Sequence, residues 1–240
     1  MRAYTDQLGS AGASMEEIVQ AALDAARPAE GLRWLDIGCG RGDLLRRVRD
    51  RWRPAALCGV DPIDWLDDDL RDAVELHTVA AEQAHALPRA DRVLLVETLE
   101  HLEAPWSALR AAARLVAPGG WLVVSTPNLA TLRHRLELAV RGNLTSFRPG
   151  YEPHLTPALP HVTARILAEE GLTVQPPRYA GADVIPLAGG RVWPERVRRR
   201  YPLLTSISVA IAAHRAGLSQ GAGQHNGAPA ADRAGSSRTV

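Results

Sequence analysis

Lysine is absent from this chain, and cysteine and aromatic residues are scarce. All 28 basic residues are arginine, and 27 acidic residues bring the formal net charge to +1. This balance excludes a global field that attracts polyanions, although it leaves room for a local basic face. Cys39 and Cys58 are the only cysteines, so the chain cannot build a disulfide framework.

Long apolar segments are missing as well. No apolar run approaches the roughly 20 residues that a membrane-spanning helix requires, and residues 1–30 lack the apolar core of a signal peptide. Apolar residues make up 46% of the 240 residues and charged residues 23%, which is typical of a globular protein with a sizeable core. We therefore expect a reduced, cytoplasmic protein with one large α/β domain.

Short apolar runs alternate with amphipathic helical patterns over the first half of the chain. Strands are predicted at residues 34–37, 56–60, 92–96 and 121–125, and helices at 44–52 and 106–116. Such alternation predicts a mostly parallel sheet with helices on both faces. Pro105 stands at an expected first helical position, and Trp106 and Trp121 follow the periodicity of core positions.

The two ends of the chain differ from its centre in composition. Residues 1–13 are small and polar and are expected to be flexible. A capping-box spacing that starts at Ser14 predicts a helix ending before Pro28. The tail 217–240 is rich in Gly, Ala and Ser and is expected to be disordered. The folded domain is therefore expected to span residues 14–216.

The second half of the chain shows weaker patterns. Helices are predicted from Leu129 to a closing Gly142 and from Thr156 to a closing Gly171, around a loop at 143–156, with late strands at 172–175 and 206–212. His134 and His161 are expected to be exposed helix residues. The segment 129–156 is expected to cap a substrate site, because such connecting segments carry specificity in many folds.

A predicted strand runs into three alternate glycines, Gly38, Gly40 and Gly42, and then into a helix. Glycines let a backbone turn tightly and approach a ligand that a Cβ would repel. The third glycine follows the second by two residues, whereas the dinucleotide fingerprint requires three. Asp36 precedes the first glycine by two, and Asp61 follows a second apolar strand, where an acid can accept both ribose hydroxyls of a nucleoside.

With these motifs the chain resembles the class I S-adenosylmethionine-dependent methyltransferases. The acid-x-Gly-x-Gly-x-Gly signature of that family matches residues 36–42, its ribose-binding acid matches Asp61, and its Pro-Gly-Gly matches 118–120. The resemblance covers residues 34–128 and continues more faintly to about residue 213. It implies a Rossmann-like α/β fold with a mostly parallel seven-stranded sheet, helices on both faces and a late antiparallel strand.

The resemblance also implies how the cofactor binds. Asp36, Gly38 and Gly40 would surround the methionine portion of S-adenosylmethionine, and the adenine would be flanked by Glu82 or Gln83, where the family more often has Asp. Two alternatives stay open. A nicotinamide-dependent dehydrogenase shares the first βαβ unit, and a scaffold or regulatory protein could bind the cofactor without turnover.

Three side chains that suit metal binding or proton transfer follow the predicted strand at 92–96. Glu97, Glu100 and His101 are spaced i, i+3 and i+4, so on a helix they would share one face. Converging oxygen and nitrogen donors suit Mg²⁺, Mn²⁺ or Zn²⁺. The carboxyl end of a parallel strand is also where ligands bind in doubly wound sheets.

The Glu-x-x-Glu-His pattern resembles the metal-binding motif of small-RNA 2′-O-methyltransferases, and is similar to that region of the ubiquinone-biosynthesis O-methyltransferases. By the first resemblance a downstream histidine completes the metal site, and His154 is the match in this sequence. The alternative is a metal-independent site in which Glu97 helps to hold the cofactor and His101 acts as the base.

The expected reaction is methyl transfer to a hydroxyl group, because Glu100 and His101 supply deprotonating power near the methyl group. A small metabolite, a sugar and a quinone precursor all remain open as acceptors. The near-zero net charge argues against a nucleic-acid substrate. Arginines interleaved with apolar residues at 191–201 suit peripheral contact with an anionic membrane, although a solvated helix face is the alternative.

Overall fold

In the computed structural model, which describes residues 8–148, 150 and 153–217, one mixed sheet forms the centre of the fold. Its strands are β1 Arg33–Ile37, β2 Ala56–Val60, β3 Val74–His77, β4 Ala90–Val96, β5 Val116–Pro127, β6 Thr173–Val174, β7 Arg178–Ala182 and β8 Ser206–His214. The strand order is β3-β2-β1-β4-β5-β8-β6, with β7 also paired to β8. The first five strands are parallel and β8 is antiparallel to β5, which confirms the predicted fold.

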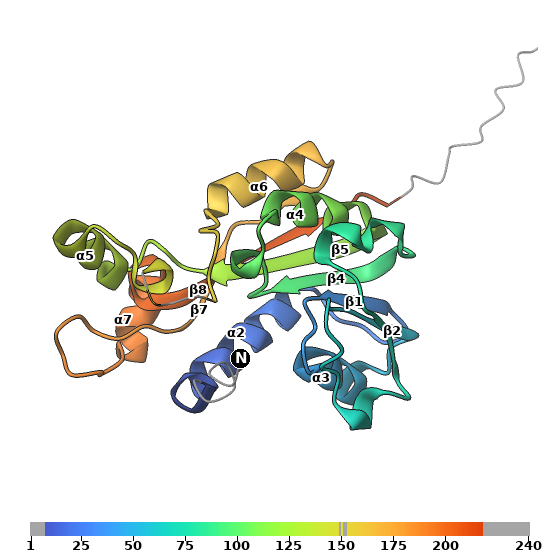
Figure 1. The fold of residues 1–240 in the computed structure, drawn as a ribbon, viewed down its shortest axis with the longest axis horizontal. Coiled ribbons are helices and arrows are strands. Elements are labelled where there is room, and N and C mark those ends of the chain that lie inside the picture. The colour runs from blue at the N-terminus through green and yellow to red at the C-terminus, as the bar shows by residue number, and fades with distance from the viewer. Residues whose placement is uncertain (1–7, 149, 151–152, 218–240) are drawn as a thin grey trace, which may run out of the picture.

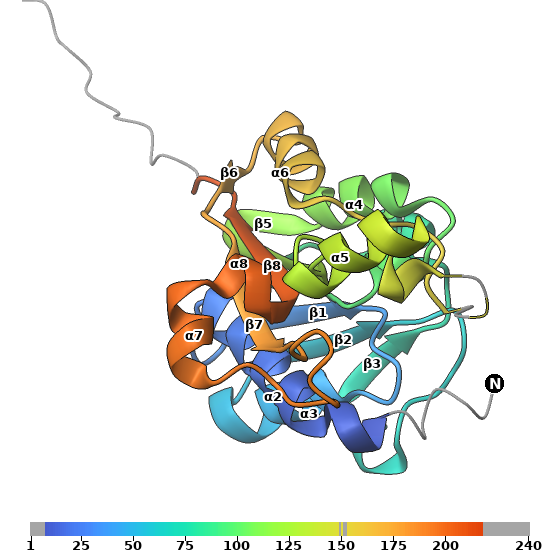
Figure 2. The same ribbon diagram turned by 90° about the vertical axis from the view of Figure 1, so that its left-hand side faces the viewer.

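The two short strands that precede β8 in the chain, β6 and β7, follow one another along the same edge of β8 (Figure 2). Thr173 pairs with His214 and Arg178 with Ala210, both antiparallel, with one extra residue on the β6–β7 side. The interruption falls at residues 176–177, two prolines that have no N–H to donate to a neighbouring strand. The sheet therefore has the predicted seven strand positions, although one of them is filled by two segments.

The helices cover both faces of the sheet, with α4 and α6 on one side and α2 and α3 on the other (Figure 1). The helices are α2 Leu8–Ala25, α3 Asp43–Trp52, α4 Pro105–Arg114, α5 Leu132–Arg141, α6 Pro160–Glu169, α7 Glu195–Arg200 and α8 Pro202–Thr205. Short 3₁₀ helices are η1 Asp68–Leu70, η2 Ala81–Ala86, η3 Leu99–His101 and η4 Thr145–Phe147. Among the described residues, no helix has the length and apolarity that a membrane span needs.

A hydrophobic core lies on each face of the sheet. Leu35 of β1 joins the core beneath α4 and α6, and its neighbour Trp34 joins the core beneath α2 and α3. Successive strand side chains point to opposite faces, so one strand supplies both cores. Trp106 and Trp121, expected at core positions, each pack against one of these cores with part of the ring accessible.

Two helix starts differ from the sequence prediction. Helix α2 begins at Leu8, before the predicted cap at Ser14, whose hydroxyl instead accepts a hydrogen bond from the Ala182 backbone N–H at 3.2 Å. Part of the segment 1–13 is therefore helical, while residues 1–7 and the tail from 218 lie outside the described residues. Helix α6 begins at Pro160 rather than Thr156, and the Thr156 N–H donates to the Glu100 carbonyl in η3 at 3.1 Å.

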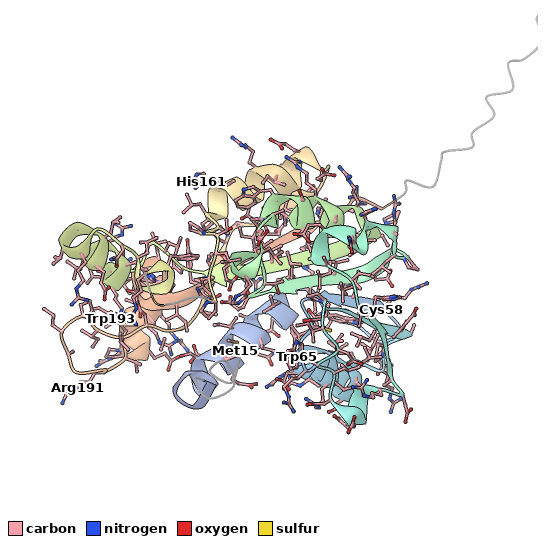
Figure 3. The ribbon with its side chains drawn as sticks, in the orientation of Figure 1. Met15, Cys58, Trp65, His161, Arg191 and Trp193 are labelled. Carbon is pink, nitrogen blue, oxygen red and sulfur yellow. The ribbon has the colours of Figure 1, made fainter. Side chains whose placement is uncertain are left out.

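The burial of His134 on helix α5 is the reverse of the prediction. His134, expected to be exposed, is buried because its backbone N–H donates to Thr131 Oγ1 at 3.2 Å and its ring nitrogens lie 2.9 and 3.2 Å from the Thr131 and Ser146 hydroxyls. Leu136 and Val140 on the same helix are 43% and 80% exposed. The helix extends beyond the end of β5, where it lacks a sheet face to cover (Figures 1 and 2). His161 is exposed at the start of α6, as predicted (Figure 3).

Candidate active site

The loops that follow β1, β2 and β4 meet at the carboxyl edge of the sheet. Gly38 N–H and Cys39 N–H both donate to the carbonyl of Val60, at 2.7 and 3.1 Å, which joins the first loop to the end of β2. Thr98, after β4, donates its hydroxyl to the Ile37 carbonyl at 3.2 Å. In open parallel sheets ligands bind at this edge.

The three alternate glycines all have left-handed backbone angles, with φ values of +82°, +51° and +86° for Gly38, Gly40 and Gly42. A Cβ on Gly38 would lie 2.5 Å from the Thr98 side chain, and one on Gly42 would overlap two leucine side chains. A Cβ on Gly40 would meet nothing within 4 Å. The fold itself therefore requires the outer glycines, whereas Gly40 leaves open a space that a ligand can fill.

Asp61 holds the glycine loop in place from the end of β2. Its Oδ2 accepts a hydrogen bond from the Gly40 N–H at 3.1 Å, and its Oδ1 accepts one from the Ile63 N–H at 3.0 Å. Each carboxylate oxygen can accept a further hydrogen bond. The same group can therefore fix the loop and bind hydroxyl groups of a ligand.

Asp36 lies at the base of the loop and is only 3% exposed. Burial, with a smaller effect from the charge of Asp61, raises the pKa of its carboxyl to about 7. Burial and the charges of Asp36 and Asp61 likewise raise the pKa of the Cys39 thiol, so it is not an activated nucleophile. A cation beside Asp36 would favour the ionised carboxylate and offset the cost of burying it.

Glu97 does not share a helical face with Glu100 and His101, so the prediction of one common face is wrong. Helix η3 starts only at Leu99, and Glu97 has a left-handed φ of +49°. Its Oε1 accepts hydrogen bonds from the Ser125 and Ser208 hydroxyls, both at 2.7 Å. Burial raises the pKa of Glu97, and these two hydroxyls oppose the rise.

The two serines were missed by the sequence analysis. Ser125 lies in the buried second half of β5, and Ser208 lies on the antiparallel strand β8, far along the chain. Only the pairing of β5 with β8 brings their hydroxyls together. No local signal in the sequence announces that arrangement.

Glu100, His101 and His154 form a second group beside Glu97. One ligand-type atom from each of the three residues lies within 4.8 Å of the other two. The His101 and His154 rings meet edge to face with centroids 4.9 Å apart. The structure therefore brings together three of the four residues expected to bind a metal, and Glu97 is not in this group.

The loop that carries His154 is fastened to helix η3 on both sides of the histidine. His101 Nδ1–H donates to the Pro153 carbonyl at 2.6 Å, and the Glu100 carbonyl accepts from the Leu155 and Thr156 N–H groups at 2.7 and 3.1 Å. These backbone contacts place His154 in the cluster although it is remote in sequence. Its side chain also packs against Phe147, with ring centroids 5.3 Å apart.

Burial dominates the electrostatics of this group. Glu100 is 1% exposed, and burial together with the charge of Glu97 raises its pKa well above the ordinary range. Burial lowers the pKa of His101, while burial and the neighbouring His101 lower that of His154 to about 4. Both imidazoles are therefore neutral near pH 7, the form that binds a cation, and the lowered pKa makes His154 a weak proton acceptor.

Glu82 and Gln83 follow β3 in helix η2, where Ala81 and Ala84 supply the buried face. Glu82 is half-buried and Gln83 is exposed. The basic stretch 191–201 contains α7, in which Arg198 pairs with Glu17 at 2.6 Å. Figure 3 shows Arg191 at the outer tip of this region.

Comparison with known proteins identifies a family. Residues 11–175 match a family model described as a methyltransferase domain. The ubiquinone biosynthesis O-methyltransferase of Paracidovorax citrulli is 30% identical over 207 residues, which cover 81% of this chain and 81% of that protein. The protein of the same name from Rhizobium rhizogenes is 33% identical over 159 residues, covering 62% of this chain and 63% of that protein.

Solved structures share the fold. A SAM-dependent methyltransferase from Archaeoglobus fulgidus has a TM-score of 0.56 and 19% identity, covering 81% of this chain and 90% of that chain. A chain from a complex of the Haloferax volcanii Trm112 activator with a methyltransferase has a TM-score of 0.64 and 17% identity, covering 89% and 95%. With the family match, the curated relatives and the glycine loop, these findings show that the chain belongs to the class I S-adenosylmethionine-dependent methyltransferases.

Proposed function

We propose that this methyltransferase acts on a hydroxyl group of a small molecule, and that Glu100, His101 and His154 act on that hydroxyl. The observation that carries the proposal is the convergence of one carboxyl group and two imidazoles within 4.8 Å at the carboxyl end of β4. An amine acceptor would need less deprotonating power than a hydroxyl. The name of the curated relatives makes a hydroxylated quinone precursor the first acceptor to test.

The cofactor fits the edge formed by the glycine loop. We place its methionine portion beside Asp36 and Gly40, its ribose at Asp61, and its adenine near Glu82 or Gln83. The open space at Gly40 and the fixed carboxylate of Asp61 support this placement. S-Adenosylmethionine supplies a methyl group on a positively charged sulfur, so the chain must hold the acceptor in line at roughly 3 to 3.5 Å and remove its proton.

A divalent cation also fits the cluster. Among the described residues, the buried Oε2 of Glu100 has no hydrogen-bond partner, as expected for an atom that awaits a ligand. Glu100, His101 and His154 would hold the ion. Glu97, which accepts hydrogen bonds from two serines, would position these three ligands from the side of the cofactor. Mg²⁺, Mn²⁺ or Zn²⁺ bound there would orient the acceptor hydroxyl and lower its pKa.

A metal-independent mechanism is supported by the tautomer of His101. A carbonyl can only accept, so the contact of Nδ1 with the Pro153 carbonyl places the ring proton on Nδ1 and makes Nε2 the basic nitrogen. Nε2 could then take the hydroxyl proton directly while the oxygen attacks the methyl group. Residues 129–156, which supply His154 and Phe147, are the proposed substrate cap in either mechanism.

Chelation separates the two mechanisms. The assay measures S-adenosylhomocysteine released with hydroxylated aromatic acceptors, before and after EDTA and after addition of Mg²⁺, Mn²⁺ or Zn²⁺. The metal mechanism predicts that turnover is lost with EDTA and returns when one of these ions is added. His154→Ala should need a higher ion concentration for the same turnover, whereas the matched control His161→Ala, at an exposed position, should not. Indifference to EDTA with loss in His101→Ala assigns His101 as the base. If no hydroxyl compound supports turnover, the proposed acceptor class is wrong.

We also propose peripheral membrane contact through residues 191–201. Arg198 and Arg199 are paired with Glu17 and Glu195, which removes part of the basic charge from the surface. Flotation with vesicles of anionic or neutral lipid tests the contact. The proposal predicts salt-sensitive binding to anionic vesicles only, and no binding would contradict it.

A further inference from the structure

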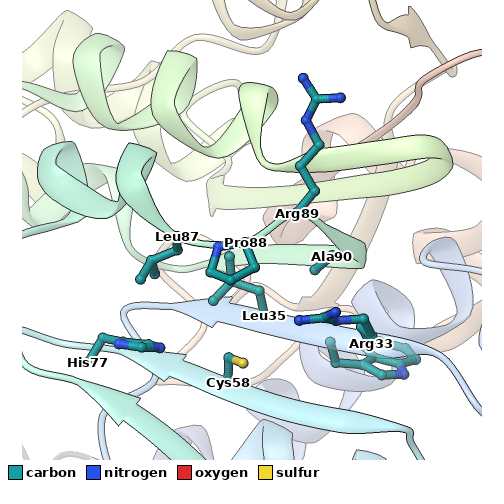
Figure 4. Close-up of a pocket in the computed structure, with 9 residues that line it drawn as sticks. Arg33, Leu35, Cys58, His77, Leu87, Pro88, Arg89 and Ala90 are labelled. Atoms are coloured by element: carbon teal, nitrogen blue, oxygen red, sulfur yellow. The ribbon is translucent and has the colours of Figure 1, made fainter.

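A second cluster of metal-ligand side chains lies on β2 and β3. Cys58, Glu75 and His77 each offer one ligand-type atom within 4.8 Å of the other two. Cys58 and His77 also line a narrow cavity between these strands and the turn at residues 87–90 (Figure 4). Neither the glycine loop nor the Glu100 group contributes a residue to this cluster.

The register of the two strands explains why these side chains converge. Glu75 and His77 are two residues apart, so both point to the same face of β3. Cys58 is the direct cross-strand partner of Glu75. His77 pairs with Val60, which lies two residues after Cys58 on β2, so His77 is a diagonal neighbour of Cys58. Directly opposed and diagonal neighbours on one face are within side-chain reach.

The distances suit one ion held by sulfur, nitrogen and oxygen. His77 Nε2 lies 3.3 Å from Glu75 Oε1. Two such ligands on a tetrahedral zinc ion would be separated by about 3.3 to 3.6 Å, given the usual zinc–ligand bond lengths. Cys58 and His77 are half-buried and Glu75 is exposed, so the site is accessible from solvent. Cys58 is also a free thiol.

We propose that Cys58, Glu75 and His77 form a site for a borderline-soft divalent cation, with Zn²⁺ the best match, separate from the catalytic cluster. The combination of thiolate and imidazole favours zinc over Mg²⁺ or Ca²⁺, which take oxygen ligands. Three protein ligands leave one position for water. Binding releases the thiol proton and ties the edge strand β3 to β2.

Arg33 brings a positive charge to this site. It lines the same cavity, and its charge partly offsets the rise in the Cys58 thiol pKa that burial and Glu75 cause. Arg33 therefore favours the thiolate but repels a bound ion, and Glu75 supplies the opposing negative charge. Replacing Glu75 by glutamine should weaken metal binding more than it changes the fold, because Glu75 is exposed.

Cobalt substitution tests the proposal, because a thiolate bound to Co²⁺ gives a near-ultraviolet charge-transfer absorption that oxygen and nitrogen ligands do not. The full chain, stripped of metal and kept reduced, is titrated with Co²⁺ and then with Zn²⁺. We expect this absorption at one Co²⁺ per chain, its displacement by Zn²⁺, and its loss in Cys58→Ser. Glu75→Gln and His77→Ala should each lower Co²⁺ affinity about tenfold or more.

Matched controls separate this site from the others. Cys39→Ala, which removes the other cysteine, should keep the absorption, as should Glu100→Gln, which alters the catalytic cluster. Circular dichroism shows whether each variant folds. In the Glu100→Gln variant, which lacks one ligand of the catalytic cluster, Zn²⁺ should still raise the melting temperature, and adding Cys58→Ser should remove that rise. Absence of the absorption from the folded original protein, or its persistence in Cys58→Ser, overturns the proposal. Neither outcome depends on the methyl acceptor.

Discussion

The raised pKa of Asp36 predicts a specific dependence of protein stability on pH. The carboxyl has a pKa of about 7 in the folded protein, against an ordinary value of 3.8, because it is buried. The folded state therefore binds more protons than the unfolded state between these two values. Its free energy of unfolding falls as the pH rises through that window, and no further loss from this group occurs above about pH 7.

The size of the effect follows from the same interval. At about 1.4 kcal/mol per unit of pKa, ionising Asp36 in the folded protein costs about 4 kcal/mol as an upper limit. Asp36→Asn keeps the shape and cannot ionise, so the variant should avoid this cost. Without cofactor, we expect the free energy of unfolding of the variant, relative to that of the original protein, to increase by about 1.4 kcal/mol per pH unit up to pH 7. Above pH 7 this difference should stay constant.

Urea denaturation at pH 5, 6, 7 and 8 measures this difference, with Asp72→Asn, which removes an exposed carboxylate, as the matched control. The difference in free energy of unfolding between this control and the original protein should be the same at every pH. A stability difference between Asp36→Asn and the original protein that stays constant from pH 5 to 8 would show that Asp36 does not titrate in this range in the folded protein. If Asp36 binds the cofactor's ammonium group, the same variant should also lose cofactor affinity while it gains stability.

Three further predictions concern the glycine loop and the strand behind it. Asp61→Ala should weaken S-adenosylmethionine binding ten- to hundredfold, or about 1.5 to 3 kcal/mol by calorimetry, and tight NAD binding instead would contradict the assignment. Gly38→Ala should cost about 2 to 5 kcal/mol of unfolding free energy, because its Cβ meets Thr98 in a left-handed backbone. Gly40→Ala should cost less stability but lose cofactor affinity, and equal stability losses would show that both glycines serve packing alone.

The first half of the fold could be predicted from the sequence because each element there carries a strong periodic pattern. The predicted strand at 56–60 coincides with β2, and the helix at 44–52 differs from α3 by one residue. The short edge strand β3 was not predicted, because its four residues are too few to establish an alternating pattern. Patterns of two to four residues do not distinguish a strand from a turn.

The position of Glu97 and the burial of His134 could not be predicted for a different reason. Helical spacing assigns Glu97 to the same face as Glu100, but its left-handed backbone places it before the helix and against two serines from other strands. His134 is buried because Thr131 and Ser146 satisfy its polar atoms. Periodicity records apolar positions and carries no information about such polar pairs.

The most direct test of the account follows the methyl group itself. The protein is incubated with S-adenosylmethionine that carries ¹³C in the methyl group and with a hydroxylated quinone precursor, and the product is examined by nuclear magnetic resonance. We expect a ¹³C methyl resonance typical of a methyl ether, which disappears when His101 is replaced by alanine. A methyl group on nitrogen or carbon, or transfer that survives His101→Ala unchanged, would contradict it.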